Sequence, residues 1–160
     1  MTNYENSPGD CILIYISGYC PAQRGRASFA VTIRRIVDGR EVKMMKIVST
    51  ARETTAAQRE VAALLAALRC LKRDEQLRVI IRSDLKYVLQ GASEWLANWK
   101  ERGWKAANRK PIEVPDLWKQ IDSQLAELSA VQIEFQWVPS GVNDARNVEV
   151  TEMSQRQVAA

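Results

Sequence analysis

Residues 83–118 read SDLKYVLQGASEWLANWKERGWKAANRKPIEVPDLW, and this stretch says most about the fold. It starts at the end of a short apolar strand and continues into a helix that we predict from Tyr87 to Trp99, with a break near Gly91. A segment rich in lysine, arginine and tryptophan follows, and a further helix is predicted from Pro115 to Leu128. An apolar strand that ends in an acid before a helix is typical of α/β domains.

The segments on either side of this stretch predict a mixed sheet. Predicted strands cover residues 11–16, 29–34, 42–48, 77–81 and 131–137, where apolar or alternating runs are bounded by turn signals. Residues 58–72 have helical periodicity instead, with an apolar stripe that includes Val61, Leu64 and Leu68. A C-terminal helix is predicted from about Ala145 onward. We therefore predict an α/β fold with a five-stranded mixed sheet and helices on both faces.

Length and charge indicate one basic domain. The chain has 160 residues and a net charge of +4, and we predict a flexible leader in residues 1–10 and a single domain in residues 11–160. The excess of Lys and Arg favours nucleic acid or an acidic protein surface as a partner. No apolar run approaches the roughly 18 residues that a membrane span needs, and the first residues lack a signal-peptide pattern, so no membrane association is predicted. Three scattered cysteines favour a reducing compartment, and we predict a cytoplasmic or nuclear protein.

Two carboxylates stand out as candidate site residues. Glu60 lies on the helical stripe that should face the sheet, where an unpaired charge is costly. Asp84 follows the predicted strand 77–81, at the strand end where α/β folds place their ligands. Stabilisation by the helix dipole would account equally well for Glu60, and helix capping for Asp84. Because the chain has no histidine, any hydrolytic chemistry would run on carboxylates and metal ions.

The order and wording of these segments resemble the ribonuclease HI family. The resemblance covers nearly the whole chain after the leader and is closest in residues 83–118. TTAAQREVAALLAALRCLK, residues 54–72, is similar to the family's glutamate-bearing helix, and IEFQWV, residues 133–138, is similar to the strand before its last loop. The resemblance implies a ribonuclease-H-like fold. For an intact member it also implies that four carboxylates hold two magnesium ions, which act in cutting an RNA strand paired to DNA.

The sequence departs from the family at its metal ligands. Glu60 and Asp84 match two of the four carboxylates, but Ser17 and Thr151 stand at the other two positions. A neutral hydroxyl is a poor ligand for a hard divalent cation. The family's assisting histidine has no counterpart here. The remnant carboxylates Glu60 and Asp84 would hold at most a single metal ion weakly, so no cofactor is required, and Mg²⁺ or Mn²⁺ matters only if activity remains.

Neighbouring acids are not placed to replace the lost ligands. Glu149 and Glu152 flank Thr151, but on a helix their side chains point about 200° and about 100° away from it. Asp144 lies in the preceding loop, and the strand that ends at Ser17 has no acid nearby.

A basic protrusion remains as a candidate binding surface. We define it as residues 99–110, WKERGWKAANRK, and in the family the matching segment contacts the DNA strand of a hybrid. The expected nucleic-acid-binding residues are Lys86, Trp99, Lys100, Arg102, Trp104, Lys105, Arg109 and Lys110 in and beside the protrusion, and Arg24 and Arg26 in an earlier loop. Basic side chains neutralise phosphates, and tryptophans pack against helices or sugars. Core tryptophans beside solvated charges would give the same composition.

We therefore expect a catalytically inactive ribonuclease-H-like protein that binds nucleic acid, as an RNA/DNA hybrid or another duplex. Two alternatives remain open. The fold can serve as a protein-interaction module, such as an inhibitor or a subunit of a nucleic-acid machine, with Tyr19, Arg24 and Arg26 on the partner surface. The chain can also be a weak metal-dependent endonuclease on RNA/DNA hybrids that uses Glu60 and Asp84.

Overall fold

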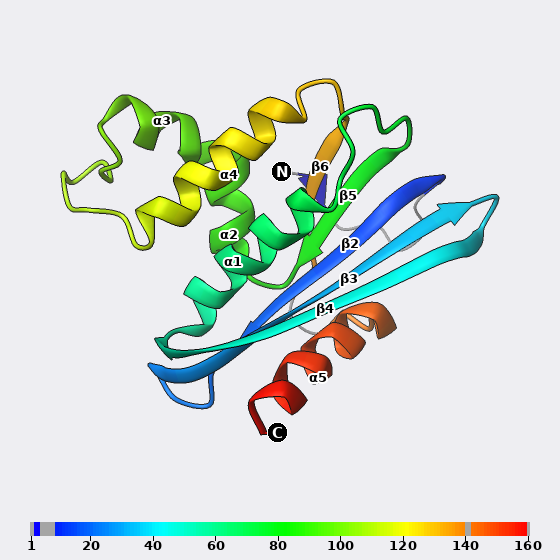
Figure 1. The fold of residues 1–160 in the computed structure, drawn as a ribbon, viewed down its shortest axis with the longest axis horizontal. Coiled ribbons are helices and arrows are strands. Elements are labelled where there is room, and N and C mark those ends of the chain that lie inside the picture. Colours follow the sequence, from blue (N-terminus) through cyan, green and yellow to red (C-terminus); the bar gives the residue numbers. More distant parts are fainter. Residues whose placement is uncertain (1, 4–8, 140–141, 160) are drawn as a thin grey trace.

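A computed structural model describes residues 2–3, 9–139 and 142–159 of the chain. Its centre is a six-stranded sheet in the order β1-β6-β5-β2-β3-β4 (Figure 1). The strands are β1 (Thr2–Asn3), β2 (Cys11–Tyr19), β3 (Gly25–Val37), β4 (Arg40–Thr54), β5 (Arg78–Ser83) and β6 (Ile133–Trp137). The five predicted strands are thus confirmed, and the two-residue β1 extends the sheet at β6.

Strand directions make the sheet mixed, as predicted. β3 pairs antiparallel with β2 and β4, whereas β5 pairs in parallel with β2 and β6. β4 is longer than predicted because its ladder with β3 continues as far as the Gly25–Thr54 pair. β1 pairs in parallel with β6 inside the predicted leader, whose residues 1 and 4–8 lie outside the described residues. The flexibility of that leader stays a prediction.

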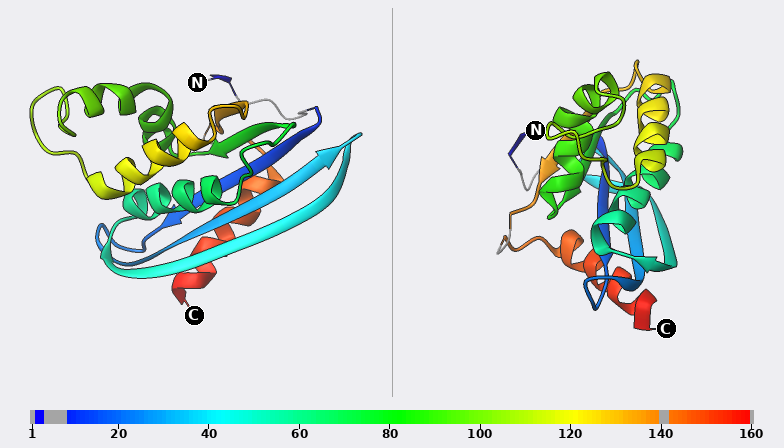
Figure 2. Two further views of the ribbon diagram at one scale, coloured as in Figure 1. Left: turned by 45° about the horizontal axis from the view of Figure 1, so that its top comes forward. Right: turned by 90° about the vertical axis from the view of Figure 1, so that its left-hand side faces the viewer.

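Helices cover both faces of the sheet, which confirms the predicted layers (Figure 2). They are α1 (Ala56–Arg69), α2 (Lys86–Gln90), the π-helical turn η1 (Gly91–Trp95), α3 (Leu96–Glu101), α4 (Pro115–Glu127) and α5 (Ala145–Ala159). α5 packs on one face against β2 and β3, and α1 packs on the other face with α4 against it. None of the helices in the described ranges combines the length and apolar composition that a membrane-spanning helix needs.

The start of α1 is fixed by a side-chain cap and a buried stripe. The Thr55 hydroxyl accepts a hydrogen bond of 3.1 Å from the backbone amide of Gln58, so the helix begins at Ala56, two residues before the predicted start. Its buried residues include Val61 and Leu64, which belong to the main core cluster with residues of β2, β3 and β5. Burial of each such side chain contributes about 1.5–3 kcal/mol, which anchors this helix over the sheet.

The break predicted near Gly91 is the π-helical turn η1. α2, η1 and α3 follow one another without a gap, and the turn widens the helical segment where it meets α4. A Cβ atom on Gly91 would lie 2.5 Å from the Cη2 atom of Trp118, whose side chain is fully buried. Glycine at this position therefore allows the helical segment that precedes the protrusion to pack closely on α4.

Gly18 allows a similarly close approach between β2 and α1. A Cβ atom on Gly18 would lie 2.9 Å from the backbone nitrogen of Glu60 and closer still to the carbonyl oxygen of Ala56. Both atoms belong to the backbone of α1, so they cannot give way as a flexible side chain would.

We expect Gly18→Ala to lower the free energy of unfolding by roughly 2–3 kcal/mol, because the added methyl group forces α1 away from β2. Denaturant titration followed by circular dichroism measures the effect. Gly9→Ala is the matched control, since a Cβ atom there meets nothing within 4 Å. Equal stabilities of the two variants would contradict the tight approach.

Candidate functional site

Glu60 lies at the centre of the candidate site and is almost completely buried. Its side chain is 2% exposed, and its carboxyl group accepts hydrogen bonds from the Ser83 hydroxyl at the end of β5 and the Gly18 backbone amide on β2. Burial raises its pKa well above the ordinary value, and the nearby Asp84 raises it further, while the two hydrogen bonds offset part of this rise. The environment therefore favours the neutral carboxyl group over the carboxylate that a cation needs.

Asp84 stands just beyond β5, as predicted, but its side chain is exposed. Its backbone carbonyl accepts a hydrogen bond of 3.1 Å from Nε1 of Trp137, which ties the end of β5 to β6. Its carboxylate is close enough to Glu60 to raise the pKa of that residue. The structure thus brings together the two acids that the sequence singled out as a pair.

Two cations that flank these acids in the sequence do not neutralise them. The Lys86 ammonium lies 4.0 Å from the ring centroid of Trp137, and the Arg59 guanidinium lies 4.8 Å from that of Phe29. Arg59 also donates a hydrogen bond of 2.9 Å to the Ser49 hydroxyl. Within the described ranges, Glu60 and Asp84 form no ion pair with either cation.

Neutral residues stand at Ser17 and Thr151, the two positions where the family resemblance implies carboxylates. Ser17 on β2 is 6% exposed, and its hydroxyl lies 3.0 Å from the Ser154 hydroxyl of α5. Ser154 donates its own hydrogen bond of 2.8 Å to the Thr151 carbonyl, so Ser17 must be the donor in the first pair. The Ser28 hydroxyl of β3 donates to the Ser154 carbonyl. We call Ser17, Ser28, Thr151 and Ser154 the hydroxyl cluster, which joins α5 to β2 and β3.

The acids Asp144 and Glu149 near Thr151 bind to other side chains. Asp144 accepts hydrogen bonds from the Tyr15 hydroxyl at 2.5 Å and from the backbone amide of Arg146 at 3.0 Å, so it caps α5. Glu149 lies 2.5 Å from a guanidinium nitrogen of Arg34 and 3.2 Å from the Lys46 ammonium. None of these contacts points an acid toward the hydroxyl cluster.

The site does not fit a pair of divalent cations. Hard cations bind several carboxylate or carbonyl oxygens, and two adjacent ions need bridging carboxylates. In the part of the chain that the structure describes, no group of three or more His, Cys, Asp or Glu side chains is arranged to hold a metal ion. The hydroxyl cluster supplies neutral groups, which are poor ligands for hard divalent cations.

We expect Glu60→Gln to flatten the dependence of stability on pH. Because the folded pKa lies above the ordinary 4.5, the folded state keeps this proton to higher pH than the unfolded chain does. The stability that the neutral group contributes is therefore present below that ordinary value and is lost as pH rises through the folded pKa. Glutamine does not titrate, so the variant should lose less stability than the unsubstituted chain as the pH rises from about 5 to about 8.

Urea titrations between about pH 5 and about pH 8 measure this difference, and the absence of histidine leaves few other groups that titrate in the range. Glu152→Gln is the control, because Glu152 is exposed on α5. Parallel pH profiles for Glu60→Gln and the unsubstituted chain would contradict the account.

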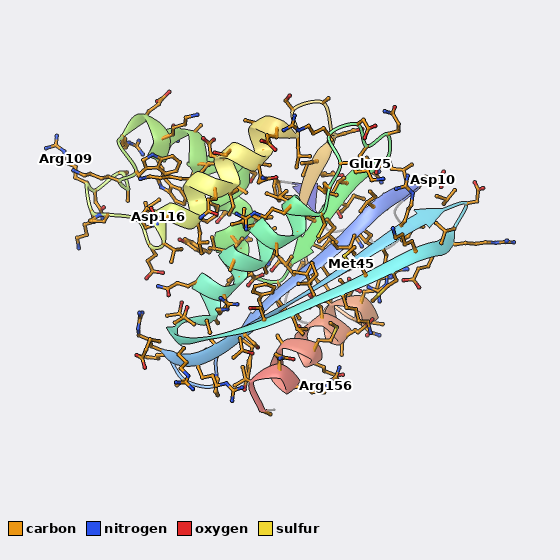
Figure 3. The ribbon with its side chains drawn as sticks, in the orientation of Figure 1. Asp10, Met45, Glu75, Arg109, Asp116 and Arg156 are labelled. Carbon is orange, nitrogen blue, oxygen red and sulfur yellow. The ribbon has the colours of Figure 1, made fainter. Side chains whose placement is uncertain are left out.

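The basic protrusion extends from the body of the molecule beyond α3, and Arg109 lies at its outer end (Figure 3). Arg102, Lys105 and Arg109 are exposed and line a hollow of about 400 Å³ together with Ala106 and Ala107. The predicted residue Lys110 is exposed as well, whereas Lys100 lies 3.1 Å from a carboxylate oxygen of Asp122. The three cations around the hollow are thus the most available for phosphate groups.

The tryptophans of the protrusion form part of the core below it. Trp99 is 7% exposed, and its ring centroid lies 5.2 Å from that of Trp118 and 5.9 Å from that of Trp95. Trp104 is half-buried, with the Lys119 ammonium 5.7 Å from its ring centroid. The alternative interpretation, of core tryptophans beside solvated charges, therefore holds for Trp99 and in part for Trp104.

An apolar hollow of about 310 Å³ adjoins the base of the protrusion. It is lined by Ala57 at the start of α1 and by Tyr87, Trp99, Ala106, Ile112 and Glu113. Ala106 lines both this hollow and the basic one, so the two surfaces are continuous. Tyr87 and Ile112 were not among the binding residues expected from the sequence.

Arg24 and Arg26 lie in a different place, at the turn between β2 and β3. Both side chains are exposed, and the turn lies at the same end of the sheet as the start of α1 (Figure 1). The expected basic side chains thus belong to two separate segments of the chain, the protrusion and the region around this turn.

Comparison with known proteins gives consistent matches over almost the full chain. The model of the RNase H family matches residues 10–158. A ribonuclease HI from Pseudomonas aeruginosa is 34% identical over 148 residues, which cover 92% of this chain and 93% of the relative. A ribonuclease H from Bordetella bronchiseptica is 34% identical over 161 residues, which cover 100% of this chain and 97% of the relative.

Solved structures match the fold at lower identity. LC9-RNase H1, a type 1 RNase H with the type 2 active-site motif, superposes with a TM-score of 0.75 at 18% identity, covering 97% of this chain and 75% of that protein. LC11-RNase H1 in complex with an RNA/DNA hybrid superposes with a TM-score of 0.64 at 19% identity, covering 93% of this chain and 99% of that protein.

Proposed function

The chain belongs to the RNase H family, and we propose that it binds RNA/DNA hybrids through its basic protrusion without cutting them. The observation that carries the proposal is the hollow of about 400 Å³ that Arg102, Lys105 and Arg109 line. Each of these side chains is exposed and can approach a phosphate oxygen.

The arrangement of polar and apolar surfaces supports a duplex ligand. The basic hollow offers contacts to phosphate groups. The adjoining apolar hollow beside Tyr87 and Ala57 offers contacts to sugars and to exposed base edges. A structural relative, LC11-RNase H1, was solved with an RNA/DNA hybrid. Contacts of this kind position the backbone of a duplex and carry little sequence information, so the proposed binding is independent of sequence.

The chemistry of the carboxylate end supports loss of cleavage. Cutting a phosphodiester with two metal ions needs charged oxygens that hold both ions beside the scissile bond. This chain presents neutral hydroxyls at Ser17 and Thr151, which leaves Glu60 and Asp84 as the acids at this end of the sheet that match the family. No metal cofactor is needed for the proposed binding, which runs on arginine and lysine side chains.

We expect the double variant Lys105→Glu/Arg109→Glu to weaken hybrid binding at least about tenfold at low salt, because two phosphate contacts become repulsive. The slope of log affinity against log salt concentration should also become shallower by about 2, at roughly one per phosphate contact. Fluorescence anisotropy with a labelled hybrid, measured in chelator, reports both quantities.

The matched control is Arg40→Glu/Arg156→Glu, which makes the same change in net charge on the β3–β4 hairpin and on α5. Hybrid affinity that falls equally in both double variants would show a general charge effect and would count against a site at the protrusion.

A further inference from the structure

The strand β4 leaves one edge of the sheet open for pairing. It is the last strand in the sheet order, and within the described ranges its only strand partner is β3 (Figure 1). Alternate residues of β4 therefore direct their backbone N–H and C=O groups away from the sheet. At the opposite edge, by contrast, the short strand β1 pairs with β6. An open edge strand is a template on which another chain can add a strand.

The central part of β4 is regular enough to accept a further strand. Residues 43–51 pair with residues 27–35 of β3 in unbroken register, and the register shifts lie beyond both ends of this stretch. β4 has 15 residues and contains no proline, so it lacks two features, shortness and proline, that commonly protect an edge strand. We call residues 43–51 the open edge, and Ile47 is its midpoint.

The open edge carries apolar side chains on both faces of the sheet. Ile47 pairs with Val31, which belongs to the core under α1, whereas Val48 pairs with Ala30, which belongs to the cluster under α5. Because side chains alternate along a strand, Met45 shares the face of Ile47. Met45 is 40% exposed and Val48 is 43% exposed, so apolar surface reaches the edge on either face.

The charges of the open edge leave its middle accessible. Lysine often guards an edge strand, but the Lys46 ammonium lies 3.2 Å from a carboxylate oxygen of Glu149 and is thus directed toward α5. Residues 43–51 contain no acid, and their second cation, Lys43, stands at the first position. A strand added at the midpoint therefore meets no cluster of like charge.

We propose that β4 pairs with β4 of a second copy of this chain, antiparallel and about a two-fold axis at Ile47. A two-fold axis perpendicular to the sheet reverses the strand direction and keeps each side chain on its own face, as an antiparallel pair requires. An axis at the midpoint overlaps the whole open edge of one copy with that of the other. The two sheets then form one continuous sheet.

The side chains favour this register and an identical strand as the partner. Ile47 lies opposite its own equivalent, Met45 lies opposite Ser49 of the second copy, and Lys46 lies opposite Val48 of the second copy. Like charges therefore do not face each other within the open edge. An axis at Lys46 would instead place two ammonium groups opposite each other, which is unfavourable. A second copy supplies a strand of the same length whose charges already avoid one another.

Sedimentation velocity of the chain without nucleic acid, at concentrations from about 1 μM to about 1 mM, tests the proposal. We expect a monomer–dimer equilibrium within this range, because an interface built on one strand pair is small. Val48→Lys should raise the dimer dissociation constant at least about tenfold, since it puts a lysine opposite Lys46 of the second copy. Val48→Glu should preserve or strengthen the dimer, since it puts opposite charges there.

Val142→Lys is the matched control, because it makes the same change at an exposed valine outside the sheet and should leave the dissociation constant unchanged. Circular dichroism confirms that each variant is folded. The proposal is overturned if the chain stays monomeric throughout, if Val48→Lys weakens the dimer no more than Val142→Lys does, or if Val48→Glu weakens it as much as Val48→Lys. The dimer does not rest on the proposed hybrid binding, so Lys105→Glu/Arg109→Glu should leave it intact.

Discussion

The buried position of Glu60, held by two hydrogen bonds, is the constraint on which the rest of the site depends. Its carboxyl group lies where α1 crosses the ends of two parallel strands, and it accepts bonds from Gly18 on β2 and Ser83 on β5. The approach is possible only because Gly18 has no side chain. Once α1 is held in this way, its apolar stripe covers the centre of the sheet, and Ala57 in its first turn lines the apolar hollow beside the protrusion. The position of α1 thus links the buried acid to the surface that we propose for binding hybrids.

Hydrogen bonds also hold the neighbouring helix at this end of the sheet. For an intact family member the resemblance implies four carboxylates here, whose mutual repulsion metal ions would offset. Here the hydroxyl cluster is neutral and its groups bond to one another, from Ser17 through Ser154 to the Thr151 carbonyl. α5 is therefore tied to β2 and β3 by hydrogen bonds that need no ion.

Much of the fold could be predicted from the sequence because its strands and helices have strong periodicity. The alternation before Trp137 and the apolar stripe around Leu64 each gave the correct element, and the pairing of Glu60 with Asp84 followed from their positions on a helix and at a strand end. The length of β4 could not be predicted, since many of its residues are exposed and only the ladder with β3 holds them in the sheet. The contacts of individual side chains could not be predicted either. Arg59 and Lys86 lie beside the acids in the sequence, but both side chains pack on aromatic rings in the structure. Long-range packing decides such details, and local sequence does not contain it.

The central proposal is that the chain binds RNA/DNA hybrids without metal-dependent cleavage. The most direct measurement incubates a hybrid labelled on its RNA strand with the chain in Mn²⁺, in chelator, and in Mn²⁺ with Glu60→Gln. The account predicts an intact RNA strand in all three, while the hybrid remains bound in chelator. Cleavage that needs Mn²⁺ and disappears in Glu60→Gln would contradict it, and would show that Glu60 and Asp84 still assemble a working metal site.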